Sequence, residues 1–216
     1  VSSVRAGGTA SRGKCMTELD VGETEAAYGK TKREAEIKLL DISRSTGLNV
    51  TIVRPALVYG PGVRGNMKRF ISAVIDDCLP MMSETENRLS MIGVDDLVSA
   101  LLLVAEEECA SGEIYIATDG VDYTTRKIFN AVEQALDRPS GKMAIPKSLF
   151  YLRALLGGLA GGRASFDSYY YHKLFNDEWH SSCKLQGIGF KPKSTLYDSL
   201  PDIISHIKGC PVTEKV

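Results

Sequence analysis

Residues 49–62 read NVTIVRPALVYGPG, and this stretch decides the fold class. Its first part is β-branched and almost continuously apolar, as a strand buried on both faces is. Pro55 has no backbone donor and is expected to end the regular ladder. The residues before it, from about Thr24 to Thr46, are good helix formers, and Gly47 follows as a typical C-terminal cap. A helix leading directly into a buried strand predicts an α/β fold with a parallel sheet.

Apolar spacing predicts further elements on both sides of this stretch. In the helix before the strand, Ala27, Leu39 and Leu40 are expected to form one apolar face. Later apolar residues recur at helical or alternating intervals. The elements expected there are helices over 66–77, 94–107 and 124–139, a strand over 112–120, one or two helices through Arg153 and Tyr170, and a final helix ending the run 184–207.

The composition is ordinary for a globular protein of one large or two small domains, with 216 residues, 44% apolar and 25% charged. Because the formal net charge is only −1, neither nucleic acid nor an anionic membrane is indicated as a partner. The five cysteines are widely spaced and the three histidines dispersed, which favours reduced thiols, a cytoplasmic location and no metal site. The longest apolar run, 152–162, is shorter than the ~20 residues of a membrane span.

Residues 25–36, EAAYGKTKREAE, place Tyr28 and Lys32 four apart on the predicted helix. Such positions share a helix face, so the ammonium can stabilise the phenolate of a side chain whose ordinary pKa is about 10. A hydroxyl from another element would complete an acid/base unit for hydride chemistry, and Ser3, at the end of an apparent buried strand, is the candidate. Alone, the pair also fits a surface tyrosine beside a solvated lysine; Ser3 before it and RPALVYGPG after it favour catalysis.

Five ordered motifs carry a family resemblance: VSSV, YGKTK, VRPALVYGPG, ENR leading to VDDLVSAL, and GIGFKPKSTLYDSL. Together they resemble the extended short-chain dehydrogenase/reductase family, and within it the nucleotide-sugar 4-epimerases and 4-ketoreductases. The resemblance implies a cytoplasmic, NAD- or NADP-dependent enzyme that acts on a nucleotide-diphosphate sugar by Tyr-assisted hydride transfer at a hexose carbon, as a homodimer when full-length. The alternatives are a dehydrogenase of steroid- or flavonoid-type alcohols and a non-catalytic binding protein with this fold.

The resemblance also implies roles for single residues. Tyr28 is the expected acid/base, Lys32 lowers its pKa and holds the nicotinamide ribose, and Ser3 orients the reacting oxygen of the substrate. Asn66 and Arg88 match positions that meet the nucleotide part of the substrate, Arg88 by forking onto a diphosphate, although a plain surface arginine is equally compatible. The segment expected to pass the nicotinamide ring consists of Pro55, Ala56, Leu57 and Val58.

One departure from the family pattern bears on the reaction. Sugar 4,6-dehydratases typically carry an acidic residue just after the hydroxyl residue of the strand end. Here Ser3 is followed by Val4 and Arg5. The sequence therefore favours an epimerase or a ketoreductase over a dehydratase.

The sequence GPGVRG, residues 60–65, satisfies the G-x-G-x-x-G pattern of dinucleotide sites. That fingerprint normally opens the first βα unit of its fold, whereas this copy follows the Y-x-x-x-K helix, so we expect only a turn leading to the substrate domain.

We expect two domains. Residues 1–62 are predicted to be the C-terminal portion of a Rossmann-type, NAD(P)-binding domain. Residues 63–216 are predicted to be mainly a smaller mixed α/β substrate-binding domain, with a strand and helix at about 94–120 returning to the Rossmann sheet. Because the chain opens without a methionine and without a glycine-rich turn upstream, we expect a truncated product that binds cofactor poorly and is inactive as a fragment.

Overall fold

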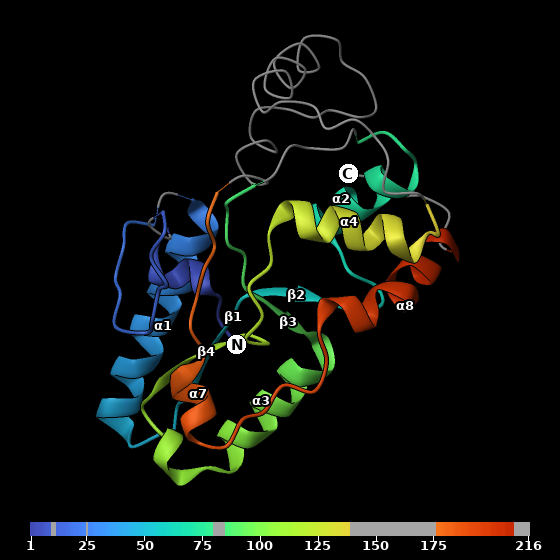
Figure 1. The fold of residues 1–216 in the computed structure, drawn as a ribbon. Coiled ribbons are helices and arrows are strands. Elements are labelled where there is room, and N and C mark those ends of the chain that lie inside the picture. Colours follow the sequence, from blue (N-terminus) through green and yellow to red (C-terminus); the bar gives the residue numbers. More distant parts are fainter. Residues whose placement is uncertain (10–11, 25, 80–84, 139–175, 210–216) are drawn as a thin grey trace. The chain divides into compact units, whose positions relative to one another are not determined.

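A computed structural model describes residues 1–9, 12–24, 26–79, 85–138 and 176–209 (Figure 1). The helices predicted through Arg153 and Tyr170 lie outside these residues. The chain divides into two compact units, each made of separate segments. The first unit comprises Val1–Tyr59, Leu89–Asp122 and Asp177–Leu196, and the second comprises Gly60–Arg88, Tyr123–Asn176 and Tyr197–Val216.

The first unit is built on short parallel strands. β1 (Ile52–Pro55) pairs with β4 (Ile114–Ala117), and β2 (Leu57–Tyr59) pairs with β3 (Met91–Gly93), both in parallel. Every residue of β1 is buried, which confirms the prediction of a strand covered on both faces. β1 ends at Pro55, as expected, and the chain then changes partner strand at Ala56. The predicted α/β class is confirmed.

The helices and turns of the first unit flank these strands in Figure 1. Helix α1 (Ala27–Thr46) ends before Gly47, which is left-handed at φ 74° and caps the helix as predicted. The apolar core packs α3 (Val94–Glu106) against the strands and includes Val53, Ile92, Val104 and Tyr115. The elements are the 3₁₀ turn η1 (Val4–Gly7), α1 (Ala27–Thr46), α3 (Val94–Glu106), the 3₁₀ turn η2 (Glu108–Ala110) and α7 (Cys183–Gly187).

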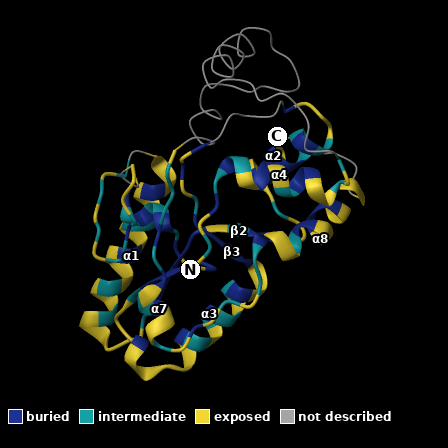
Figure 2. Cartoon of the chain, viewed as in Figure 1, coloured by how far each residue is buried: buried dark blue, intermediate teal, exposed yellow. Residues whose placement is uncertain are grey.

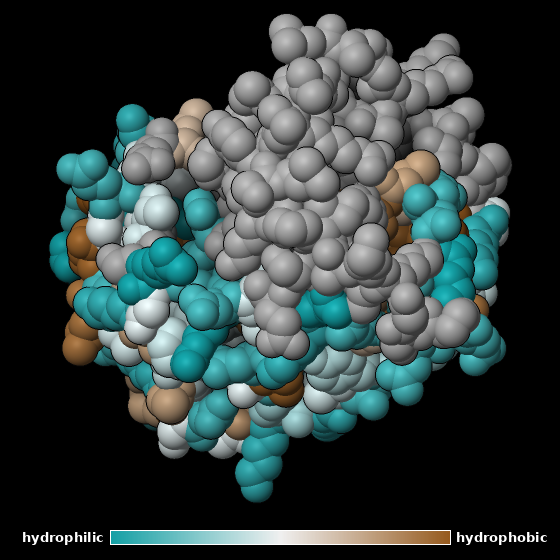
Figure 3. Space-filling view, turned by 45° about the horizontal axis from the view of Figure 1, so that its top comes forward, coloured by the Kyte–Doolittle hydropathy of each residue, from teal (hydrophilic) through white to brown (hydrophobic). Residues whose placement is uncertain are grey.

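The apolar face of α1 is not buried. Ala27 and Leu39 are exposed and Leu40 is only half-buried, whereas the buried positions of the helix are Gly29 and Glu36. Figure 2 shows α1 as largely exposed, and Figure 3 shows apolar patches on that side of the molecule. The physical reason is that α1 is attached through polar contacts and one close backbone approach, which are described below.

The residues before η1 are not a strand, which corrects an expectation from the sequence. Ser2 donates its backbone N–H to the carbonyl oxygen of Val53 in β1 at 2.7 Å, but residues 1–3 carry no strand assignment. Ser3 is instead the N-cap of η1, and its Oγ accepts a hydrogen bond from the Arg5 N–H at 3.3 Å. Ser3 therefore occupies a cap position.

The described part of the second unit is helical. It contains α2 (Gly65–Ile75), α4 (Thr125–Ala135) and α8 (Leu196–Gly209). Leu196, the first residue of α8, belongs to the first unit. α2 and α4 pack against each other, and no β-strand is assigned to the described residues of this unit. Thr124 caps α4 by accepting from the Lys127 N–H at 3.1 Å.

The GPGVRG sequence forms the turn between β2 and α2. Gly60, Gly62 and Gly65 have φ values of 149°, 79° and 64°, a backbone region that other residues rarely adopt. The prediction of a turn at these glycines is confirmed. Within the described ranges, no helix is long and apolar enough to cross a membrane, and no group of three or more His, Cys, Asp or Glu residues could hold a metal ion.

Candidate active site

Tyr28 and Lys32 lie one turn apart at the start of α1. Lys32 Nζ is 5.9 Å from the centroid of the Tyr28 ring, within cation–π range. The same Nζ donates to the carbonyl oxygen of Val1 at 3.5 Å. Tyr28 is 53% exposed, so its hydroxyl can be reached from solvent. The helix spacing therefore produces a close, accessible phenol and ammonium.

Gly29 brings α1 against the turn that Ser3 caps. A Cβ added at Gly29 would lie 2.7 Å from the carbonyl oxygen of Arg5, closer than real side-chain carbons approach. Only glycine permits the helix backbone to come this near. Because Gly29 follows Tyr28 and Arg5 lies two residues after Ser3, this contact joins the two segments that carry the candidate residues.

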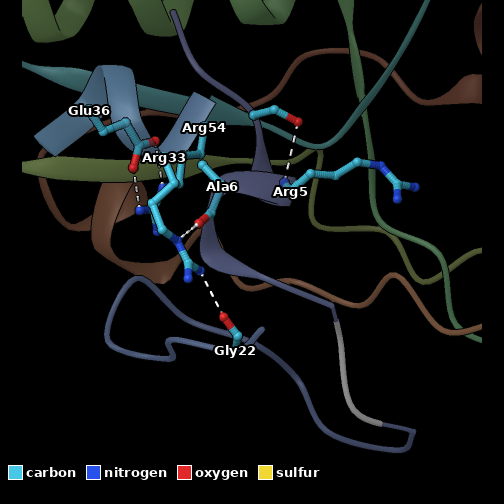
Figure 4. Close-up of polar contacts among 7 residues, drawn as sticks. Arg5, Ala6, Gly22, Arg33, Glu36 and Arg54 are labelled. Atoms are coloured by element: carbon cyan, nitrogen blue, oxygen red, sulfur yellow. Dashed lines mark hydrogen bonds and ion pairs between the residues drawn. The ribbon is translucent and has the colours of Figure 1, made fainter. Parts of the chain in front are cut away.

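Polar contacts of α1 fix the same arrangement (Figure 4). Arg33 donates from Nε to the carbonyl oxygen of Ala6 at 2.6 Å and from Nη2 to that of Gly22 at 2.9 Å. Glu36 accepts two hydrogen bonds from the guanidinium of Arg54 in β1, at 2.9 and 2.6 Å, and both side chains are buried. Helix α1 is thus tied to η1 at one point and to β1 at another.

Sequence reasoning missed Arg33, Glu36 and Arg54. One signal was available, because Arg54 is a charged residue inside an otherwise apolar strand, and a buried charge requires a partner. Nothing in the sequence distinguishes Glu36 as that partner from the other acidic residues of the chain.

The segment expected to pass the nicotinamide spans the step between β1 and β2. Pro55 and Ala56 are buried, Val58 is half-buried, and Leu57 is 43% exposed. Leu57 therefore presents an apolar side chain to solvent at the carboxyl end of β1. In open parallel sheets, ligands bind beyond the carboxyl ends of the strands.

Asn66 and Arg88 belong to the second unit, whereas the other candidate residues belong to the first. Asn66 lies in the first turn of α2, and both side chains are exposed. The loop carrying Arg88 is bound to the start of α4. Asn87 Nδ2 donates to Thr125 Oγ1 at 3.0 Å, and Thr85 Oγ1 accepts from the Arg126 N–H at 3.1 Å.

A buried histidine shapes the electrostatics of the first unit. His180 is 6% exposed, and neither ring nitrogen has a hydrogen-bond partner. Burial, followed by the positive charges of Arg5 and Arg54, lowers its pKa from the ordinary 6.5 to about 4. His180 is therefore neutral near pH 7, next to two arginines.

A family model described as the NAD dependent epimerase/dehydratase family matches residues 1–117, a range that contains every candidate residue above. The chain belongs to this family. The family resemblance drawn from the five motifs is thereby confirmed.

Individual relatives show how far the similarity extends. UDP-glucose 4-epimerase of Vibrio cholerae is 28% identical over 202 residues, covering 92% of this chain and 59% of the relative. Short-chain dehydrogenase/reductase family 42E member 1 of Danio rerio is 30% identical over 142 residues, covering 60% of this chain and 37% of the relative. The chain thus spans about three fifths or less of the length of these curated relatives.

A solved structure supports the fold. UDP-glucuronic acid 4-epimerase from Bacillus cereus, in complex with NAD, superimposes with a TM-score of 0.71 at 17% identity. The match covers 96% of this chain and 60% of that chain. At this identity, the comparison establishes a shared fold.

Proposed function

We propose that this protein is an NAD(P)-dependent nucleotide-sugar epimerase or 4-ketoreductase in which Tyr28 moves the proton at a hexose carbon. The observation that carries the proposal is the close packing of α1 on η1 at Gly29, which joins the Tyr28–Lys32 helix to the turn capped by Ser3. Membership of the NAD dependent epimerase/dehydratase family supports it, as does the similarity to the Vibrio cholerae UDP-glucose 4-epimerase.

Tyr28 is the acid/base of the proposed reaction. The Lys32 ammonium lies 5.9 Å from the centroid of the Tyr28 ring, on the same face of α1. Ser3 Oγ accepts from the Arg5 N–H, which leaves the hydroxyl proton of Ser3 to donate to the substrate. Ser3 thereby holds the reacting oxygen of the sugar for proton exchange with Tyr28.

The residues present fit a nicotinamide cofactor. Lys32 is half-buried, and its ammonium has three N–H donors. One hydrogen bond of this ammonium, to the carbonyl oxygen of Val1, is long at 3.5 Å. Tyr28 and Lys32 would hold the nicotinamide ribose through these polar groups, and the exposed Leu57 would flank the ring. When bound, NAD or NADP accepts or supplies the hydride.

We also assign Asn66 and Arg88 to the nucleotide part of the substrate. A guanidinium can fork onto a diphosphate with two parallel hydrogen bonds, and Arg88 is exposed for this. Val4 and Arg5 follow Ser3, where a dehydratase typically carries an acidic residue, which favours a reaction without elimination. The exposed apolar side chains of α1 support a homodimer of the full-length protein.

The test uses the complete gene product that contains these residues. Nuclear magnetic resonance would follow the interconversion of UDP-glucose and UDP-galactose with NAD, and absorbance would follow NADPH consumption with 4-keto sugar nucleotides. Tyr28→Phe should abolish turnover, whereas Tyr197→Phe, which changes another exposed tyrosine, should retain it. Turnover that survives Tyr28→Phe would refute the assigned role.

A second candidate function has one observation in its favour. The similarity to short-chain dehydrogenase/reductase family 42E member 1 keeps open an alcohol dehydrogenase of another substrate class. Assays with steroid and flavonoid alcohols and NAD(P) discriminate the two candidate functions. An alcohol dehydrogenase would turn over these alcohols and would not turn over nucleotide sugars.

A further inference from the structure

Arg5 connects Ser3 to a distant part of the first unit. Its backbone N–H donates to Ser3 Oγ at 3.3 Å, while its guanidinium Nη2 donates to Glu178 Oε1 at 2.6 Å. In Figure 4 the Arg5 side chain extends away from Arg33 and its neighbours, so it takes no part in the contacts that hold α1. One residue thus links the candidate hydroxyl to a carboxylate 173 positions further along the chain.

Glu178 projects from a backbone that is fixed on both sides. Its carbonyl oxygen accepts from the Ser90 N–H at 2.9 Å, and it forms a parallel bridge with Leu89, just before β3. On the other side, the neighbouring Trp179 accepts from the Met16 N–H at 2.9 Å. The backbone that carries the Glu178 carboxylate is therefore held in place on both sides.

The turn that carries Ser3 has fewer backbone hydrogen bonds within itself than an α-helix would have. η1 is a four-residue 3₁₀ turn, and such turns have poorer hydrogen-bond geometry than α-helices. The hydroxyl of a cap serine takes its direction from the backbone N–H that it accepts, here that of Arg5. Movement of Arg5 would therefore turn the Ser3 hydroxyl as well.

We propose that Glu178 is a positioning residue for Ser3, acting through Arg5. The ion pair holds the first residues of η1, and so keeps the Ser3 hydroxyl aimed at the substrate oxygen. This inference rests on the role of Ser3 in the proposed function. The Arg5 and Glu178 side chains are 35% and 29% exposed, and ion pairs open to solvent add little stability. The effect is expected on catalysis, where small displacements of a reacting group are costly.

Glu178→Gln tests the inference in the complete gene product, with Glu113→Gln as the matched control. Glu113 also pairs with a basic residue, Lys184, at 2.6 Å, and its side chain is 50% exposed. It directly precedes β4, at the amino end of that strand. We expect Glu178→Gln to lower kcat about tenfold with KM unchanged, and Glu113→Gln to leave both constants within about twofold. Glu178→Asp, which keeps the carboxylate, should recover part of the loss.

Amide hydrogen exchange supplies a readout that does not depend on turnover. The Arg5 N–H should exchange faster in Glu178→Gln than in wild type or Glu113→Gln, while the melting temperature stays the same. An unchanged Arg5 exchange rate would overturn the inference, as would a raised KM with unchanged kcat, which would make the pair a substrate-binding element. If the wild type turns over no nucleotide sugar, the proposed function fails, and the exchange rates alone decide whether Glu178 controls the Ser3 turn.

Discussion

Glu36 of α1 and Arg54 of β1 form a two-pronged ion pair in the interior of the first unit, with side chains 5% and 8% exposed. This pair explains how α1 stays attached while its apolar side chains face solvent. Two parallel hydrogen bonds from one guanidinium to one carboxylate require a defined orientation of both side chains. The pair therefore also sets the rotation of α1 about its axis. That rotation decides which way Tyr28 and Lys32 face.

Removing one partner of this pair should be costly. Glu36→Gln leaves the charge of Arg54 buried and uncompensated, which is expected to lower the free energy of unfolding by about 3–5 kcal/mol. Urea unfolding measures the loss. Asp41→Asn is the control, because the Asp41–Arg44 pair on the same helix is 63% and 76% exposed and its loss should cost under about 1 kcal/mol. Equal losses in the two variants would contradict the assigned importance of the buried pair.

The close approach at Gly29 should not tolerate a methyl group. Alanine is the better helix former, yet Gly29→Ala sets a carbon 2.7 Å from the Arg5 carbonyl oxygen, and backbone cannot yield as a flexible side chain does. We expect a net loss of about 1–3 kcal/mol in unfolding free energy together with a drop in turnover. Gly187→Ala in α7 meets no atom within 4 Å and should be neutral or slightly stabilising. A Gly29→Ala variant as stable and active as wild type would show that α1 need not pack this closely.

His180 should make stability depend on pH. Its folded pKa, about 4, lies below the ordinary 6.5 of the unfolded chain, so the unfolded state binds the proton more readily. Stability is therefore complete above about pH 6.5 and falls as the pH drops towards 4, by about 3 kcal/mol at 1.36 kcal/mol per pKa unit. Urea unfolding across this range should show the slope in wild type and a shallower one in His180→Leu.

The two adjacent serines should behave differently. Ser3→Ala removes the hydroxyl proposed to hold the substrate oxygen, and kcat should fall by about 10²-fold. Ser2 Oγ is buried without a hydrogen-bond partner, so Ser2→Ala should leave kcat unchanged and not lower stability. Steady-state kinetics and thermal unfolding of both variants decide the matter, and a similar loss of kcat in the two would argue against a specific role for Ser3.

Local patterns in the sequence predicted the elements well. The run before Pro55 had to be a buried strand because it is apolar without alternation, and Gly47 marked the end of α1 because a left-handed cap favours glycine. These features depend on neighbours within a few residues, which is why periodicity and capping preferences find them.

Contacts between distant residues could not be predicted in the same way. Leu39 and Ile42 of α1 are 45% and 47% exposed, because Glu36 and Gly29 attach the helix instead. Likewise, the sequence around Ser3 fits a strand end, but the choice between strand and cap depends on the Arg5 N–H. The partner of Arg5, residue 178, is too far along the chain for spacing to indicate it.

The segmented make-up of the first unit has a consequence for synthesis of the chain. Its strands β1 and β4, and the carboxylate that anchors the Ser3 turn, come from segments separated by pieces of the second unit. The first unit therefore cannot close until residues 177–196 have left the ribosome, although its candidate catalytic residues precede them in the chain. Such distant pairings slow folding, and until they form the apolar residues of β1 stay uncovered. During that interval the unpaired strand is a natural target for chaperones.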